Sequence, residues 1–517
     1  MQRRNPRGEA GQQELRQGIE MPILPSKEDF LRDARKGIIR PLCLREEKPG
    51  FDPAAAYRAI RGGEYSFLLE SARVDEKTGR YSFLGADPYM IFKSTGESVD
   101  IIRDGRRATL VRPPLPKLRE LMENYRVLPE PGYPPFIGGC IGFFSYDFVH
   151  NFEKLPRISH DDLGIPDAFF IFIDSLIAYD HIEKTSFIMA NPGASDRKLG
   201  YSEPEDGDWP ILYDKAAEKI LKLSEKISGI SKNERISGPT AAGIKAEPLI
   251  PKEDYERMVL RAKGYIAAGD IFQANLSQRL SADVTGIDAF DIYSVLRDVN
   301  PSPFACYLDF PGVKIVSSSP ERLVRVSGRT VDTRPIAGTR PRGKGVPGDA
   351  AMRAELLLNE KERAEHIMLI DLERNDLGRV CDFGSVRVDE LMVTEDYSHV
   401  IHIVSNVTGR LAEGKDAFDV IRAAFPGGTI TGVPKVRCME IIDELEPVAR
   451  GPYTGSVGYI SYNGDMDLNI VIRTFVIKDD KAYVQVGAGI VADSDPEREY
   501  YETLHKAEAL IKTLEKL

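Results

Sequence analysis

The sequence predicts an α+β protein in which antiparallel strands are flanked by helices. Strand-like and helix-like segments are interspersed along the chain, but they do not follow the strict strand–helix–strand order of a doubly wound parallel sheet. Residues 168–180 are rich in β-formers, whereas residues 251–268 and 496–517 carry apolar residues at helical spacing. These observations favour the α+β class over a doubly wound α/β fold.

The N-terminal part of the chain is predicted to consist mostly of strands and short turns. Residues 65–72 and 80–88 end at polar or Pro-containing breaks, and residues 168–180 form a third strand-like run. Pro88 can only begin a strand or lie at a sheet edge, because proline lacks the N–H that a strand ladder uses. A helix-like segment at 211–228 closes this part of the chain.

The C-terminal part mixes long helical patterns with antiparallel strands. Helices are predicted at 251–268, 351–376 and 496–517, and the second of these is the longest helical pattern in the chain. Strands are predicted at 304–310, 313–326, 453–463, 468–477 and 481–492.

The chain has 517 residues, which exceeds one ordinary domain and favours two or more domains, or one unusually large one. The predicted division is a disordered tail and lead-in at 1–37, an N-terminal domain at 38–227, a linker at 228–249 and a C-terminal domain at 250–517. The first stretch is polar and lacks the apolar segment of a secretory signal, and Met21 is a candidate internal start.

Composition excludes several classes of partner. The net charge of −11 argues against nucleic acid, and no apolar run approaches the roughly 20 residues that span a bilayer. The cysteines are scattered, with no CxxC pair, which fits reduced thiols in the cytoplasm better than disulfides or a zinc site. They are Cys43, Cys140, Cys306, Cys381 and Cys438.

The stretch 334–343, RPIAGTRPRG, raises a question about one small residue. Its three arginines, its turn-forming residues and its threonine are typical of a backbone loop that holds an anion. Ala337 stands in the middle of this polarity, and it bears on which reaction the chain performs.

Two predicted helices each carry a pair of glutamates three residues apart. Glu362 and Glu365 lie on one helix and Glu499 and Glu502 on the other, so both carboxylates of a pair share a helix face. If the two faces met, they would form an all-oxygen site that suits Mg²⁺ rather than zinc. Spacing alone favours the alternative, two solvated faces. His366 does not complete the ExxH pattern of di-iron proteins.

Two glycine-containing stretches and one arginine are weaker signals. Gly487 and Gly489 lie where bare backbone can approach an anion, but they lack the rest of a dinucleotide fingerprint. Residues 425–435 lack the phosphate-loop pattern, so ordinary turns remain the better interpretation of both stretches. Arg473 is predicted to lie inside an apolar strand, where its charge requires a buried anionic partner from the protein or a substrate.

Several specific motifs occur in one order within residues 334–500. They are RPIAGTRPRG, EKERAEHIMLIDLERNDLGRV, YSHVIHIVSNVTG, FPGGTITGVPKVRCMEIIDELEP and VGAGIVADSDPEREY. Together they resemble the chorismate-utilising enzymes, specifically the large synthase components of anthranilate synthase and aminodeoxychorismate synthase. The resemblance covers about 38–517 and includes EYSFLLESA and DDLGIPDAFF near the N-terminus. It implies a large antiparallel β-sandwich core flanked by helices, and chorismate as substrate.

The resemblance implies a metal site and three catalytic positions. Glu365 and Glu502 would bind Mg²⁺, with Glu362 and Glu499 in support, and the ion would hold the ring carboxylate of chorismate. The catalytic positions are Glu321, His402 and Thr429. The first matches the general acid for the departing C4 hydroxyl, which requires a raised pKa, and the histidine is associated with the loss of pyruvate.

Further positions match contacts to the substrate. They are Gln273, Ala337, Gly338, Thr339, Tyr453, Arg473, Gly487, Ala488, Gly489 and Lys506.

Two of these positions bear on the choice of nucleophile and ring carbon. Relatives that make isochorismate or salicylate have a lysine at the position of Gln273 that activates water; an amide cannot act as this base, so ammonia is favoured. The ammonia would come from a separate glutaminase subunit. Aminodeoxychorismate synthases commonly have a lysine at the position of Ala337 that can attack C2 and direct amination to C4. A methyl group cannot attack, which favours amination at C2 and anthranilate as product.

Other residues favour the aminodeoxychorismate synthases. QANLSQR, PGGTITG, DLERND and GDMDLNI are closer to those enzymes, so this activity stays open as the alternative. A non-catalytic paralogue that binds chorismate-like acids is a third hypothesis. It is disfavoured because a binding protein does not need both an acid and a metal site.

The resemblance to tryptophan-regulated enzymes implies a regulatory site. The matching residues are Glu70 and Ser71 in LLES and Pro303 and Phe304 in NPSPF. Ala305 departs from the methionine that is usual at its position. Feedback inhibition by tryptophan is therefore a hypothesis.

Overall fold

The computed structural model describes residues 22–73, 78–128, 131–196, 208–230, 243–343, 345–396 and 400–517. The predicted disordered tail up to residue 21 and the centre of the predicted linker, 231–242, lie outside the described residues. The same is true of the side chain of Thr339.

The described residues form two large antiparallel sheets, each with 12 strands. In spatial order the first sheet runs β1 (Leu42–Glu47), β10 (Thr185–Ala190), β9 (Ser175–Asp180), β3 (Tyr81–Ala86), β2 (Ser66–Glu70), β13 (Phe304–Phe310), β14 (Val313–Ser319), β23 (Thr474–Lys478), β24 (Lys481–Ile490), β12 (Gln273–Asp283) and β11 (Glu247–Pro248), with β20 (Gly432–Val433) paired to β12.

The second sheet begins with strands of the C-terminal part of the chain and ends with strands of the N-terminal part. It runs β17 (Ile336–Pro341), β19 (Val400–Arg410), β16 (Thr330–Arg334), β15 (Arg322–Ser327), β22 (Met466–Asn469), β21 (Ser456–Ser461), β7 (Gly139–Phe144), β8 (Ala168–Ile173), β4 (Met90–Thr95), β5 (Ser98–Arg103) and β6 (Arg106–Val111), with β18 (Arg387–Asp396) paired to β19.

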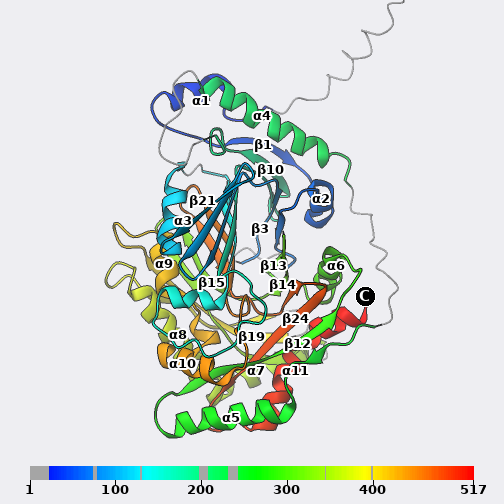
Figure 1. Cartoon of the computed structure of the whole chain (residues 1–517), viewed down its shortest axis with the longest axis vertical. Coiled ribbons are helices and arrows are strands. Elements are labelled where there is room, and N and C mark those ends of the chain that lie inside the picture. Colours follow the sequence, from blue (N-terminus) through cyan, green and yellow to red (C-terminus); the bar gives the residue numbers. More distant parts are fainter. Residues whose placement is uncertain are drawn as a thin grey trace, which may run out of the picture.

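Helices cover the two ends and the flanks of these sheets. They are α1 (Lys27–Ala34), α2 (Pro53–Ile60), α3 (Pro114–Glu123), α4 (Trp209–Lys226), α5 (Lys252–Ala267), α6 (Ala289–Val299), α7 (Gly345–Leu358), α8 (Glu360–Gly378), α9 (Ala417–Ala424), α10 (Lys435–Leu445) and α11 (Pro496–Glu515). In Figure 1, α1 and α4 lie beside β1 and β10 at one end of the molecule, and α5 and α11 lie beside β12 and β24 at the other.

Strands from both halves of the chain contribute to each sheet. In the first sheet β2 pairs with β13, and in the second β7 pairs with β21. Aromatic side chains fill the space between the sheets: the rings of Phe83 on β3 and Tyr459 on β21 are 5.4 Å apart. The predicted α+β fold with an antiparallel sandwich core is confirmed. The division into two domains stays a prediction.

Several details of the predicted elements are wrong. The run predicted as one strand at 313–326 forms β14 and β15, which belong to different sheets. The long helical pattern at 351–376 forms two helices, because Asn359 interrupts it and caps α8 by accepting a hydrogen bond from the Glu362 amide. The run 168–180 forms β8 and β9, which belong to different sheets. The segment 334–343 is largely a strand, β17, rather than a loop.

All five cysteines are buried thiols without disulfide bonds, as predicted. Burial raises the pKa of each thiol, to about 12 for Cys438, which keeps these groups protonated. Within the described parts of the chain, no helix has both the length and the apolar character needed to cross a bilayer.

Candidate active site

Strands β12 and β24 bring four of the predicted substrate-contacting residues together. The strands are antiparallel neighbours, with Asn275 opposite Gly489. Gln273 begins β12, while Gly487, Ala488 and Gly489 lie at the end of β24. A Cβ atom at Gly489 would lie 2.3 Å from Nε2 of Gln273, so this amide side chain lies directly over bare backbone.

Strands β17 and β19 place His402 beside Ala337 and Gly338. Ala337 and Thr339 both pair with β19, and Thr339 lies opposite His402. Nδ1 of His402 is 3.1 Å from the carbonyl oxygen of Gly338; because a carbonyl only accepts, Nδ1 is the donor and carries the ring proton. Gly338 has a φ of +67°, a left-handed conformation that glycine adopts without strain.

Glu321 lies between β14 and β15, and its carboxyl is buried. Burial raises its pKa to about 7. Contacts with the Thr429 hydroxyl and the Ile336 backbone favour the ionised form, and the charges of Arg473 and Lys506 act in the same direction, but they do not cancel the effect of burial. A carboxyl with this pKa can donate a proton near neutral pH, which is what a general acid requires.

Arg473 lies within electrostatic reach of both Glu321 and His402. Burial lowers the pKa of His402 to about 3, with Arg473 as the next cause, so the imidazole is neutral at neutral pH. The structure therefore gathers Glu321, His402, Thr429, Arg473 and Lys506 in one neighbourhood.

The prediction that Arg473 lies inside a strand is wrong. The run 468–477 breaks between β22 and β23, and Arg473 stands in that break with a left-handed φ of +51°. Its carbonyl oxygen accepts a hydrogen bond from the Ser318 amide at 3.1 Å. A side chain in this uncommon backbone conformation is aimed differently from its strand neighbours.

Lys506 and Tyr453 complete the surroundings of Gly487. Nζ of Lys506 donates to the carbonyl oxygen of Gly487 at 3.0 Å and pairs with Glu502 at 2.9 Å. A Cβ atom at Gly487 would lie 2.8 Å from the hydroxyl of Tyr453. A side chain larger than hydrogen at Gly487 would therefore clash.

The four glutamates predicted to bind metal lie on α8 and α11 in two separate pairs. Glu362 is 3.1 Å from the guanidinium of Arg340, and Glu502 is held by Lys506. Glu365 and Glu499 are half-buried. Among the residues that the structure describes, no group of three or more His, Cys, Asp or Glu side chains converges in a metal-binding arrangement. The carboxylate oxygens are nevertheless the donor type that Mg²⁺ prefers.

The arginines of 334–343 are paired with protein carboxylates. Arg334 contacts Glu390 and Glu395, both at 2.7 Å or less, and Arg342 pairs with Asp349. These partners account for the cluster of positive charge without a bound anion.

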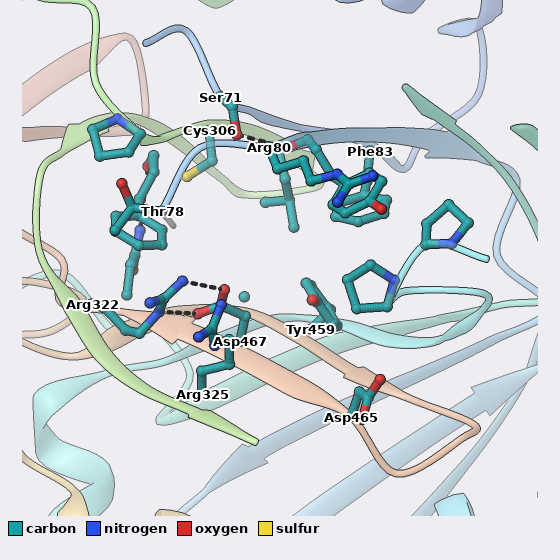
Figure 2. Close-up of a pocket in the computed structure, with 18 of the residues that line it drawn as sticks. Ser71, Thr78, Arg80, Phe83, Cys306, Arg322, Arg325, Tyr459, Asp465 and Asp467 are labelled. Atoms are coloured by element: carbon teal, nitrogen blue, oxygen red, sulfur yellow. Dashed lines mark hydrogen bonds and ion pairs between the residues drawn. The ribbon is translucent and has the colours of Figure 1, made fainter. Parts of the chain in front are cut away.

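A cavity of about 370 Å³ lies between the two sheets, and Figure 2 shows several of its lining residues. The residues predicted to form a regulatory site all line it, namely Glu70, Ser71, Pro303, Phe304 and Ala305. The carboxylate of Glu70 accepts from the Tyr293 hydroxyl at 2.6 Å and pairs with Arg297 at 2.7 Å. On the opposite wall Arg322 binds Asp467 through two hydrogen bonds, of 2.9 and 3.0 Å.

Sequence reasoning missed two residues in this neighbourhood. Asn275 follows Gln273 by two positions and therefore shares its face of β12, a signal that the alternation of a strand already contains. Glu373 on α8 is buried, and its pKa is raised by burial and by the carboxylates of Asp376 and Glu321. Nothing in the local pattern of α8 showed that this glutamate faces inward.

Comparison with known proteins identifies a family for the whole fold. The family model described as chorismate binding enzyme matches residues 66–512. Anthranilate synthase component 1 of Acetivibrio thermocellus is 44% identical over 476 residues, which cover 90% of this chain and 92% of that protein. Aminodeoxychorismate synthase component 1 of Bacillus subtilis is also 44% identical, over 87% of this chain and 92% of its own length.

A solved structure has a similar fold. The crystal structure of anthranilate synthase component I from Streptococcus pneumoniae superposes with a TM-score of 0.74 at 35% identity, covering 90% of this chain and 98% of the other.

Proposed function

Because this chain belongs to the family of chorismate-binding enzymes, we propose that it is the synthase component of an anthranilate synthase, which converts chorismate and ammonia to anthranilate and pyruvate. The observation that carries the choice of product is Ala337. It lies on β17, beside the strand of His402, at the position where relatives that aminate C4 commonly have a lysine. A methyl group cannot form a covalent bond to C2, so C2 remains open to ammonia.

In the proposed first step, the lone pair of ammonia attacks C2 of chorismate. The two ring double bonds shift, from C1=C2 to C1=C6 and from C5=C6 to C4=C5, as the C4–O bond breaks. Glu321 gives its proton to the departing oxygen, which leaves as water. The new ammonium group on C2 then returns one proton to the Glu321 carboxylate. Glu321 is protonated again, and the net charge is unchanged over the step. The raised pKa of Glu321, about 7, leaves a substantial fraction of this carboxyl protonated near neutral pH, so it can act as the acid.

In the proposed second step, C2 loses its proton and the C3–O bond breaks. The ring becomes aromatic, and the enolate that leaves takes up a proton to become pyruvate. His402 is the candidate base, because its proton is on Nδ1 and Nε2 is therefore the proton-accepting atom. A substrate carboxylate bound to Arg473 would offset the positive charge that lowers the pKa of His402, and would make this base stronger.

We further propose that Mg²⁺ is the cofactor, held by Glu365 and Glu502 with support from Glu362 and Glu499. The carboxylate donor set fits a hard cation, and the carboxylate of chorismate would add oxygen ligands that the protein lacks. The ion would supply positive charge that holds and polarises the substrate carboxylate. A separate glutaminase subunit would supply ammonia, and the buried reduced thiols favour the cytoplasm.

The proposal is tested by the products formed from chorismate. The purified chain is incubated with chorismate, Mg²⁺ and a high concentration of ammonium salt at mildly alkaline pH, and the products are separated with fluorescence and mass detection. Ammonium bypasses the glutaminase, so no partner is required. We expect a fluorescent product with the mass of anthranilate, formed together with pyruvate.

Aminodeoxychorismate synthase is the second candidate, favoured by the QANLSQR and DLERND motifs and by the Bacillus subtilis relative. A product that retains the enolpyruvyl group and yields 4-aminobenzoate only with a separate lyase would assign the chain to that activity. Binding of chorismate without turnover would instead support the non-catalytic paralogue.

We also propose that tryptophan binds in the cavity between the sheets and inhibits the enzyme. The cavity gathers the matching residues Glu70, Ser71, Pro303, Phe304 and Ala305. The apolar side chains that line the cavity suit an indole ring.

Tryptophan is expected to inhibit ammonium-dependent turnover of the wild-type chain, and Ser71→Leu is expected to abolish this inhibition. Ser71 is 4% exposed, so a larger apolar side chain would fill the space that the ligand needs. The rates are measured with and without tryptophan, and the melting temperature checks that the variant folds. Unchanged wild-type activity at high tryptophan concentration would contradict the regulatory proposal.

A further inference from the structure

Two side-chain oxygens on one face of β12 are buried without a hydrogen-bond partner among the described residues. They are Oε1 of Gln273 and Oδ1 of Asn275. The residues are two positions apart on a strand, so their side chains leave the backbone on the same side. A buried polar atom without a partner costs free energy, and such atoms concentrate where a ligand supplies the missing bond.

The two amides lie over the glycines of β24. A Cβ atom at Gly489 would lie 2.3 Å from Nε2 of Gln273, and one at Gly487 would lie 2.5 Å from Oδ1 of Asn275. Any other residue at either glycine would push the amide away. β12 and β24 run side by side in the first sheet, so the arrangement rests on a continuous ladder (Figure 1).

The ligand of these oxygens must donate hydrogen bonds and carry little positive charge. Amide oxygens only accept, and they are not bases at neutral pH. The ammonium of Lys506 donates to the carbonyl oxygen of Gly487, which places a positive charge beside the site. This charge repels a second cation. A small neutral molecule with several N–H donors meets both conditions.

We propose that Gln273 and Asn275 form a binding site for ammonia, the nucleophile of the amination step. This inference rests on the proposed function. Two N–H groups donate to Oε1 and Oδ1, which turns the nitrogen lone pair away from β12 and toward the substrate. The electron pair of nitrogen forms the C–N bond, and the proton released afterwards returns to Glu321 as described above. Water is a weaker nucleophile than ammonia and needs a base to activate it, which neither amide can be.

The test compares Michaelis constants for ammonium and for chorismate. Asn275→Leu and Asn275→Ala remove the acceptor, and we expect each to raise the KM for ammonium at least tenfold while the KM for chorismate changes less than twofold. Asn275→Thr keeps an oxygen acceptor and is expected to retain a KM for ammonium close to that of the wild type. Melting temperatures identify any variant that does not fold, and the smaller alanine side chain then serves in place of leucine.

Gln278 provides a matched control on the same strand. Its Oε1 is also buried without a partner in the described structure, but it lies on the opposite face of β12, where its Nε2 donates to Thr503 on α11 at 2.6 Å. Gln278→Leu is expected to leave the KM for ammonium unchanged, even if it lowers the melting temperature.

The outcomes separate this site from the proposed function. A wild-type chain that forms no aminated product from chorismate and ammonium contradicts the function itself. A wild-type chain that does form one, with an unaltered KM for ammonium in both Asn275→Leu and Asn275→Ala, overturns the ammonia site alone. Equal increases in the KM for ammonium and for chorismate also overturn it, because they indicate a general distortion of β12.

Discussion

Replacing Glu321 by glutamine is expected to lower kcat about 10²- to 10⁴-fold and, at the same time, to stabilise the folded chain above pH 7. Glutamine keeps the shape of the side chain but cannot give a proton to the departing oxygen. It also removes a carboxyl whose ionisation burial opposes.

The stability effect has a definite sign and pH window. Burial raises the pKa of Glu321 from 4.5 to about 7. Between these values the folded chain binds more protons than the unfolded chain, so the free energy of unfolding falls as pH rises, and the loss is complete above about pH 7. Glu321→Gln lacks this loss. The difference in melting temperature between variant and wild type should therefore be larger at pH 8 than at pH 5.

Glu373→Gln is the matched control, because Glu373 is also a buried carboxyl with a raised pKa. We expect it to stabilise the chain in the same direction while keeping turnover, since we assign this residue no catalytic role. A Glu321→Gln variant with near-wild-type turnover would remove the general-acid assignment. A stability difference that does not change with pH would contradict the raised pKa.

Replacing Glu365 or Glu502 by alanine is expected to abolish Mg²⁺-dependent turnover, with a loss of at least about 100-fold. A bound metal contributes several kcal/mol of charge stabilisation, and each ~1.4 kcal/mol is a factor of ten in rate. Turnover is measured over a range of Mg²⁺ concentrations. The shift of melting temperature with Mg²⁺ and chorismate reports binding independently of activity.

Glu508→Ala controls for the loss of a helix ion pair. Glu508 and Lys512 form an i,i+4 pair on α11 at 2.6 Å, as Glu502 and Lys506 do at 2.9 Å. Exposed pairs of this kind contribute little, so Glu508→Ala should keep both its activity and its response to Mg²⁺. Retained Mg²⁺-dependent turnover in Glu365→Ala and Glu502→Ala would reject the metal assignment.

Elements whose signals are local follow the sequence closely. The predicted helix at 251–268 is α5, which begins after Pro251, and the predicted helix at 496–517 is α11, whose first turn is capped by Asp495. The predicted strand at 304–310 is β13. Capping and periodicity involve only a few neighbouring residues, so the pattern alone is sufficient to predict them.

The candidate site was only partly accessible from the pattern. Motifs identified Glu321, His402 and Arg473, but neither burial nor the pKa of a carboxyl is encoded in its near neighbours. Glu321 is enclosed by segments that are distant in sequence, including those of Thr429, Arg473 and Lys506. The role proposed for Asn275 depends on its position over Gly487, which lies on the neighbouring strand β24.

The amino-acid pattern alone was therefore enough for the fold class and for several helices and strands, and it named the candidate reactive side chains. Tertiary structure alone decided which partners those side chains have. In the folded chain Arg334 and Arg342 pair with carboxylates, and β8 and β9 lie in different sheets. Arg473 lies in the break between two strands, with a left-handed backbone conformation. The physical reason is range: capping and periodicity act within a few residues, whereas burial, charge pairing and sheet registry depend on segments that meet only in the folded chain.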